Sequence, residues 1–63
     1  MNARTHYEEM AFQAQKLALT EAIAETIEHL SLAMRCPMTA MVDLNHARKS
    51  FERARQVAME LEQ

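Results

Sequence analysis

The sequence predicts an all-α protein: a two-helix antiparallel hairpin that dimerises into a four-helix bundle. Three observations lead to this prediction. The 63-residue chain is rich in Ala, Leu, Met, Glu, Gln, Lys and Arg, the residues with high helix propensity. It has eleven Ala, no Gly and one Pro, so a single residue interrupts helical structure. Its apolar residues recur at the spacing of amphipathic helices.

The first helix is expected over residues 6–35. Thr5 and Glu8 have the spacing of a capping box, in which each side chain accepts a hydrogen bond from the backbone N–H of the other residue. The Glu8 carboxylate also lies at the positive end of the helix dipole, where an anion is stabilised. Pro37 has no N–H and its ring restricts the preceding residue, so the helix ends at or before Cys36.

A turn over residues 36–39 leads to a second helix over residues 40–62. Thr39 is the expected N-cap, with Asp43 as the alternative if the helix begins late. A connection this short favours an antiparallel hairpin over a single helix kinked at Pro37. The whole chain, residues 1–63, is therefore expected to be one helical-hairpin domain.

The apolar faces of the two helices differ. The second helix has an Ala-rich heptad seam that allows a neighbouring helix to approach closely, formed by Ala40, Leu44, Ala47, Phe51, Ala54, Ala58 and Leu61. The first helix has a main apolar stripe of Phe12, Leu19, Ile23, Ile27, Leu30 and Met34. Its first half has a second apolar sector, roughly opposite, of Tyr7, Met10, Ala14, Leu17 and Ala18. One helix can cover only one of these sectors, so the other needs a further partner.

A homodimer supplies that partner. Cores of chains below about 70–80 residues rarely stabilise a fold alone, and one Cys cannot form a disulfide within the chain. A symmetric pair of hairpins buries both sectors in a four-helix arrangement. The predicted dimer interface is the second sector, that is Tyr7, Met10, Ala14, Leu17 and Ala18.

The sequence has no recognisable catalytic, cofactor or metal site, and we expect no enzyme activity. Without Gly the chain cannot form the phosphate-binding loops that need it. His29 and Cys36 are seven residues apart, too far to ligate one ion, and the histidines are expected at the surface. Cys36 is expected to be a buried or half-buried filler, because the negative end of the first helix disfavours a thiolate.

Two charged segments are candidate contact sites on a chain of net charge −2. An acidic strip on the first helix comprises Glu21, Glu25 and Glu28. A basic segment on the second helix comprises Arg48, Lys49, Arg53 and Arg55, with Arg48 and Arg55 beside the apolar seam and the other two on the far side. The leading hypothesis is a protein–protein contact through the strip or through Arg48 and Arg55. The alternative is nucleic-acid binding through all four cations.

No segment approaches the roughly 18 apolar residues of a membrane span. Charged residues such as Arg4 and Glu8 near the start of the chain do not fit a secretory signal. Together with the unpaired Cys, these features predict a cytoplasmic protein.

The opening segment Thr5-His6-Tyr7-Glu8-Glu9-Met10, the Ala- and Met-rich helices and the chain length resemble the small early-region proteins of the exo–xis region of lambdoid phages. That resemblance implies a small helical protein made early in infection. It would act in the bacterial cytoplasm on the host cell cycle or the lysis–lysogeny balance, through host partners and without catalysis. The architecture also resembles plasmid-encoded RNA-binding hairpins that form four-helix bundles. The Ala seam departs from those proteins, so their RNA binding is not carried over.

Overall fold

The computed structural model describes residues 5–62 and consists of two α-helices joined by one short turn. Helix α1 spans His6–Arg35, the 3₁₀ turn η1 spans Pro37–Thr39, and helix α2 spans Ala40–Glu62. The described residues contain no strand, and the all-α prediction is confirmed. Residues 1–4 and 63 of the predicted domain lie outside the described range.

Helix α1 begins with the predicted capping box. The Glu8 N–H donates to Thr5 Oγ1 at 3.2 Å, and the Thr5 N–H donates to Glu8 Oε1 at 3.3 Å. These bonds satisfy two backbone donors near the helix start, and Glu8 and Glu9 place negative charge at the positive end of the dipole. The start of α1 is thus determined by two residues that lie three positions apart in the sequence.

The break between the helices lies at Cys36 and Pro37. Cys36 leaves helical geometry, with φ −130° and ψ 89°, and its N–H donates to the Leu32 carbonyl at 2.9 Å. Pro37 opens η1, and the Thr39 N–H donates to the Cys36 carbonyl at 3.2 Å. Thr39 does not have the predicted N-cap geometry: it lies in η1, and its Oγ1 lies 3.1 Å from Asp43 Oδ2. The chain enters α2 through a 3₁₀ turn, which takes the place of a side-chain cap.

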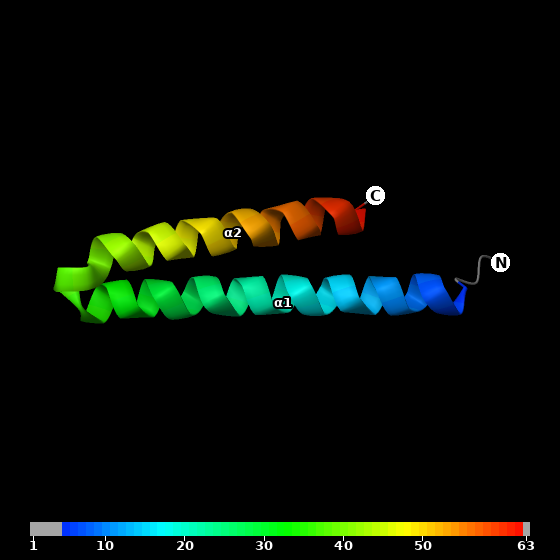
Figure 1. Cartoon of the computed structure of the whole chain (residues 1–63), viewed down its shortest axis with the longest axis horizontal. Helices are drawn as coiled ribbons and strands as arrows, with labels where there is room; N and C mark the ends of the chain where they lie inside the picture. The colour runs from blue at the N-terminus through cyan, green and yellow to red at the C-terminus, as the bar shows by residue number, and fades with distance from the viewer. Residues whose placement is uncertain (1–4, 63) are drawn as a thin grey trace.

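Beyond the turn, α2 lies alongside α1, and the N-terminal end of α1 extends past the end of α2 (Figure 1). The molecule measures 54 × 15 × 14 Å and has a radius of gyration of 15.3 Å. A compact domain of this length has a radius of gyration of about 11 Å. The chain is therefore a rod two helices thick, in which most side chains are exposed to solvent.

Small side chains form the contact between the helices. Ala22 is 1% exposed and faces α2, in which Ala47, Ser50 and Ala54 are 4%, 5% and 6% exposed. No large side chain among the described residues is fully buried. The predicted seam is correct at Ala47 and Ala54, whereas Phe51 of the same predicted seam is exposed. The small-residue seam is the name used below for the four buried residues Ala22, Ala47, Ser50 and Ala54.

Helix α2 leaves large side chains of both apolar sectors of α1 exposed, whereas one sector was expected to be covered. In the main stripe, Ile27 is 59% exposed, and in the second sector Tyr7 is 82% exposed. Helix α2 instead packs on the line of small residues between the two sectors, centred on Ala22. Small side chains allow closer backbone approach than Ile or Leu would, so the large apolar side chains project to the flanks of the seam.

Candidate functional site

An apolar groove runs between α1 and α2 along one flank of the small-residue seam. Its volume is about 380 Å³, and it is lined by Leu19, Ile23, Thr26, Ile27, Phe51, Ala54, Arg55 and Ala58. A second hollow of about 250 Å³ shares Thr26 and Phe51 with it and continues toward the turn along Leu30, Leu44, Ala47 and Arg48. We call the two hollows together the apolar groove.

The groove exposes large side chains and presents few polar atoms. Leu30 and Leu44 are less than half exposed, while Ile27 and Phe51 are more than half exposed. The Thr26 hydroxyl donates to the Ala22 carbonyl at 2.8 Å, so it already has a partner within its own helix. A contiguous apolar surface of this kind on a solvent-exposed face is typical of a protein interaction site.

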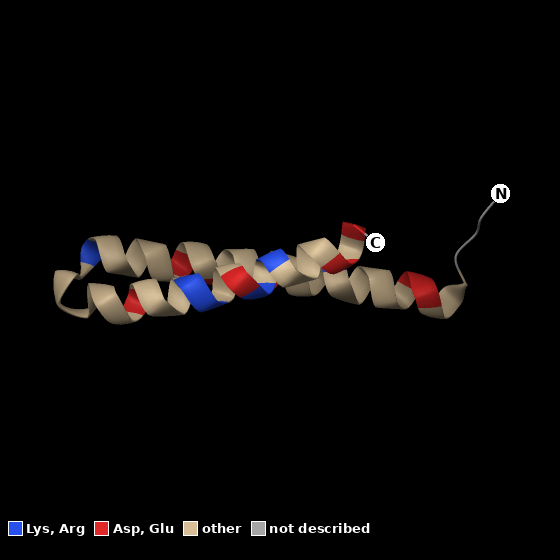
Figure 2. Ribbon diagram, turned by 90° about the horizontal axis from the view of Figure 1, so that it is seen from above, with Lys and Arg blue, Asp and Glu red and all other residues tan. Residues whose placement is uncertain are grey.

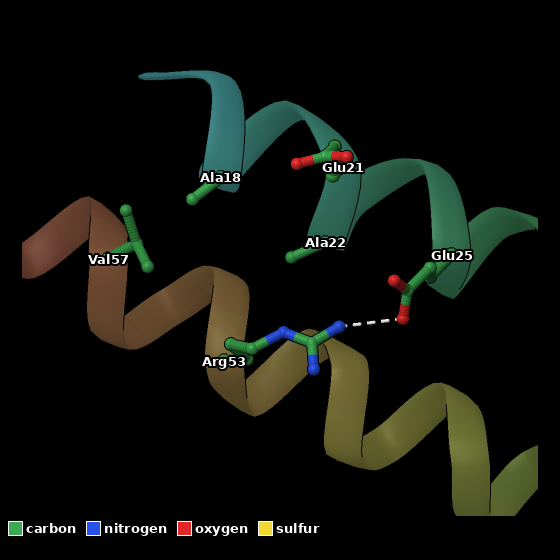
Figure 3. A pocket seen from close by; sticks show the side chains of 6 residues that line it. All are labelled: Ala18, Glu21, Ala22, Glu25, Arg53 and Val57. Atoms are coloured by element: carbon green, nitrogen blue, oxygen red, sulfur yellow. Dashed lines mark hydrogen bonds and ion pairs between the residues drawn. The ribbon is translucent and has the colours of Figure 1, made fainter. Parts of the chain in front are cut away.

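The opposite flank of the seam is polar. A hollow of about 210 Å³ there is lined by Ala18, Glu21, Ala22, Glu25, Arg53 and Val57. Figure 3 shows Arg53 of α2 reaching across to Glu25 of α1, where its Nη2 donates to Oε2 at 2.6 Å. The Ser50 hydroxyl donates to the same oxygen at 3.4 Å. Both ion-pair partners are more than half exposed, so this bridge contributes only about 0–1 kcal/mol.

The four cations of the predicted basic segment do not form one patch. Arg48 and Arg55 line the apolar groove, whereas Arg53 lies on the polar flank in its ion pair with Glu25. Figure 2 shows positive and negative residues interspersed along α2. A nucleic-acid surface is typically a concentrated basic face, so this distribution does not favour the alternative function.

Most of the predicted dimer interface lies at the N-terminal end of α1. Tyr7, Met10, Ala14 and Leu17 are exposed. Ala18 is different, because Figure 3 shows it beside Val57 of α2 in the polar hollow. The structure therefore separates Ala18, which adjoins the chain's own second helix, from the other four residues.

Sequence reasoning missed a cluster of polar rings between the helices near the turn. His29 of α1 stacks on His46 of α2, with ring centroids 5.0 Å apart and an interplanar angle of 24°. His29 Nδ1 is buried, has no hydrogen-bond partner among the described residues, and lies 3.7 Å from Asp43 Oδ1. His29 is therefore not the surface residue that was expected. Its helical position beside Ala22 and Ala33 is the signal that could have placed it between the helices.

The prediction that Cys36 is a buried filler with a disfavoured thiolate is wrong. Cys36 is exposed at the end of α1. Hydrogen bonds from the Thr39 hydroxyl, and then from the backbone N–H groups of Thr39 and Met38, lower the pKa of its thiol. These bonds outweigh the opposing effects of partial desolvation and the Asp43 charge. The prediction considered only the dipole of α1, whereas the thiol also faces the N–H groups that begin η1.

Over residues 5–62, no group of three or more His, Cys, Asp or Glu side chains is arranged to hold a metal ion. Neither helix, over the same residues, has an apolar stretch long enough to cross a membrane. No protein-family model, curated protein or solved structure matches the chain.

Proposed function

We propose that this protein is a non-enzymatic adaptor or regulator that works as a homodimer of antiparallel helical hairpins. In this proposal two hairpins form a four-helix bundle, and the surface that remains binds a host protein in the bacterial cytoplasm. The resemblance to phage early-region proteins suggests host control, through the cell cycle or the lysis–lysogeny balance, as the setting.

One observation carries the proposal: the hydrophobic residues that the chain buries among residues 5–62 are Ala22, Ala47 and Ala54. Burial of apolar area is the main favourable term in folding, and an Ala side chain contributes little of it. Large side chains such as Ile27, Leu30 and Phe51 remain at the surface. A chain with this distribution gains most of its hydrophobic stabilisation by association, as obligate dimers do.

The polar flank is the surface left for a second protein once the apolar side chains are covered. It presents the acidic strip of Glu21, Glu25 and Glu28. Complementary charge at an interface contributes specificity and association rate more than affinity. We therefore expect a partner with a basic contact surface.

Sedimentation equilibrium at micromolar concentration tests the dimer. The expected mass is twice the 7.3 kDa of one chain, with helical circular dichroism that declines on dilution. A monomer that stays folded at 7.3 kDa would contradict the proposal.

Affinity capture from nuclease-treated host lysate tests the contact surface. We expect the wild type to retain a partner that a Glu21→Lys, Glu28→Lys variant loses. The matched control is a Glu52→Lys, Glu60→Lys variant, which makes the same charge change at two exposed positions of α2. A captured protein that disappears with nuclease would support nucleic-acid binding instead, and equal capture by both variants would exclude the acidic strip.

A further inference from the structure

We propose that a second copy of this chain sits on the apolar groove, so that the homodimer interface is the groove and not the sector from Tyr7 to Ala18. This inference rests on the proposed homodimer and identifies the surface through which it forms. The contact would be isologous: the groove of one copy packs against the groove of the other across a two-fold axis.

The exposed area is sufficient for such an interface. The single chain exposes 5365 Å². A compact monomer of this mass exposes about 4,200 Å², so the excess is about 1,200 Å². Each partner in a stable complex of standard size contributes about 800 Å². The excess of the whole rod is thus larger than the area that one partner contributes, so the chain exposes enough surface to form a stable dimer.

The groove is lined by both helices, whereas the second sector lies on α1 alone. On α1 the main stripe continues without a charge from Leu19 through Ile27 to Leu30. The second sector ends at Ala18, because the following residues on that side, Glu21 and Glu28, are acidic. Two copies joined through that side would bring like charges together, which costs free energy.

The need for a partner whenever the chain is folded identifies the occupant as a second copy. A hairpin that buries mainly Ala is not stable as a monomer, so a ligand that is present only part of the time cannot be its partner. A second copy is present wherever the chain is made. The stems of Arg48 and Arg55 can cover the groove edge and leave their guanidinium groups in water, so they do not prevent pairing.

A matched pair of substitutions separates the two surfaces. Ile27 and Leu17 are 59% and 61% exposed in the single chain, so a charge at either position disturbs few contacts within the hairpin. We expect Ile27→Glu to raise the dimer dissociation constant more than about 100-fold, because the charge would be buried without a partner. Leu17→Glu should change it less than about threefold, as expected for an exposed site.

Cysteine protection gives a second measurement that does not depend on a folded monomer. In a Cys36→Ser background, Ile27→Cys should react with a water-soluble maleimide at least about tenfold more slowly than Leu17→Cys, because interface side chains are desolvated. Dilution below the dissociation constant should remove the difference. A wild-type chain that is monomeric overturns both the proposed function and this inference.

A stable wild-type dimer in which Leu17→Cys is protected and Ile27→Cys reacts freely overturns only the inference. Protection of Ile27→Cys that appears only after host extract is added would place a different protein in the groove and would also overturn it. Equal reactivity of the two cysteines in the dimer contradicts the proposed interface as well.

Discussion

The two flanks of the two-helix rod border the same small-residue seam but differ in chemistry. On one flank Ile27 and Phe51 leave apolar surface open to water. On the other flank Glu25 and Arg53 form an ion pair that bridges the helices within one chain. Among residues 5–62 no element covers the apolar flank, whereas on the polar flank an ion pair joins the two helices. Under the proposed function, association depends on the first flank and specificity on the second.

The largest expected effect tests the apolar flank. Phe51→Ala should lower the free energy of unfolding of the dimer by about 3 kcal/mol, because an aromatic side chain buried by association is lost. Chemical denaturation at two protein concentrations measures it. The effect should shrink when unfolding starts from a largely dissociated sample. A loss below about 1 kcal/mol would show that Phe51 stays in water in the dimer.

The seam beneath both flanks is tested by over-packing. Ala54 packs against α1 and is only 6% exposed. Ala54→Leu should therefore lower the free energy of unfolding by about 2 kcal/mol, because the larger side chain forces the helices apart. The control is Ala24→Leu, which adds the same side chain at an exposed position of α1 and should change stability little. Thermal unfolding of both variants measures the difference. Equal stability of the two would mean that the helices do not pack through Ala54.

The stacked pair of His29 and His46 near the turn is expected to lower the free energy of unfolding. His29→Leu should raise the free energy of unfolding by about 1 kcal/mol, because it removes a buried nitrogen that has no hydrogen-bond partner. His6→Leu, at an exposed position, provides the control. If His29→Leu destabilises the protein in urea denaturation, the stacking on His46 outweighs the desolvation cost.

The polar flank should respond weakly. A double-mutant cycle of Glu25→Ala and Arg53→Ala should give a coupling free energy of about 0.5 kcal/mol at low salt, since both side chains are more than half exposed. The coupling should fall further at about 0.5 M salt, because exposed charges are screened. A coupling above about 2 kcal/mol would remove the contrast between the flanks, because the ion pair would then rival apolar burial.

The smallest change concerns the Cys36 thiol. Because the Thr39 hydroxyl lowers the pKa of Cys36, Thr39→Val should raise that pKa. Less thiolate is then present at a fixed pH below the pKa, so alkylation by iodoacetamide should slow and its pH profile should move to higher pH. The control is Thr20→Val, whose hydroxyl donates to the Lys16 carbonyl in α1. An unchanged profile in Thr39→Val would assign the lowered pKa to the backbone N–H groups alone.

Local features of the fold could be predicted from the sequence. The capping box at Thr5 and the stop before Pro37 depend on residues within one turn of helix, so nearby sequence determines them. The seam of α2 was predicted correctly at Ala47 and Ala54, because helical periodicity places them on one line. Which line of α1 faces α2 was not predictable in the same way, since two apolar sectors were available.

The sequence by itself determined two helices, their ends and the absence of a large core within one chain. Only the tertiary structure decided that α2 packs on Ala22 between the two apolar sectors. That choice exposed the apolar groove and brought His29 against His46. The physical reason is that periodicity ranks helix faces by hydrophobicity. Helix packing also depends on how closely two backbones can approach, and small side chains allow the closest contact.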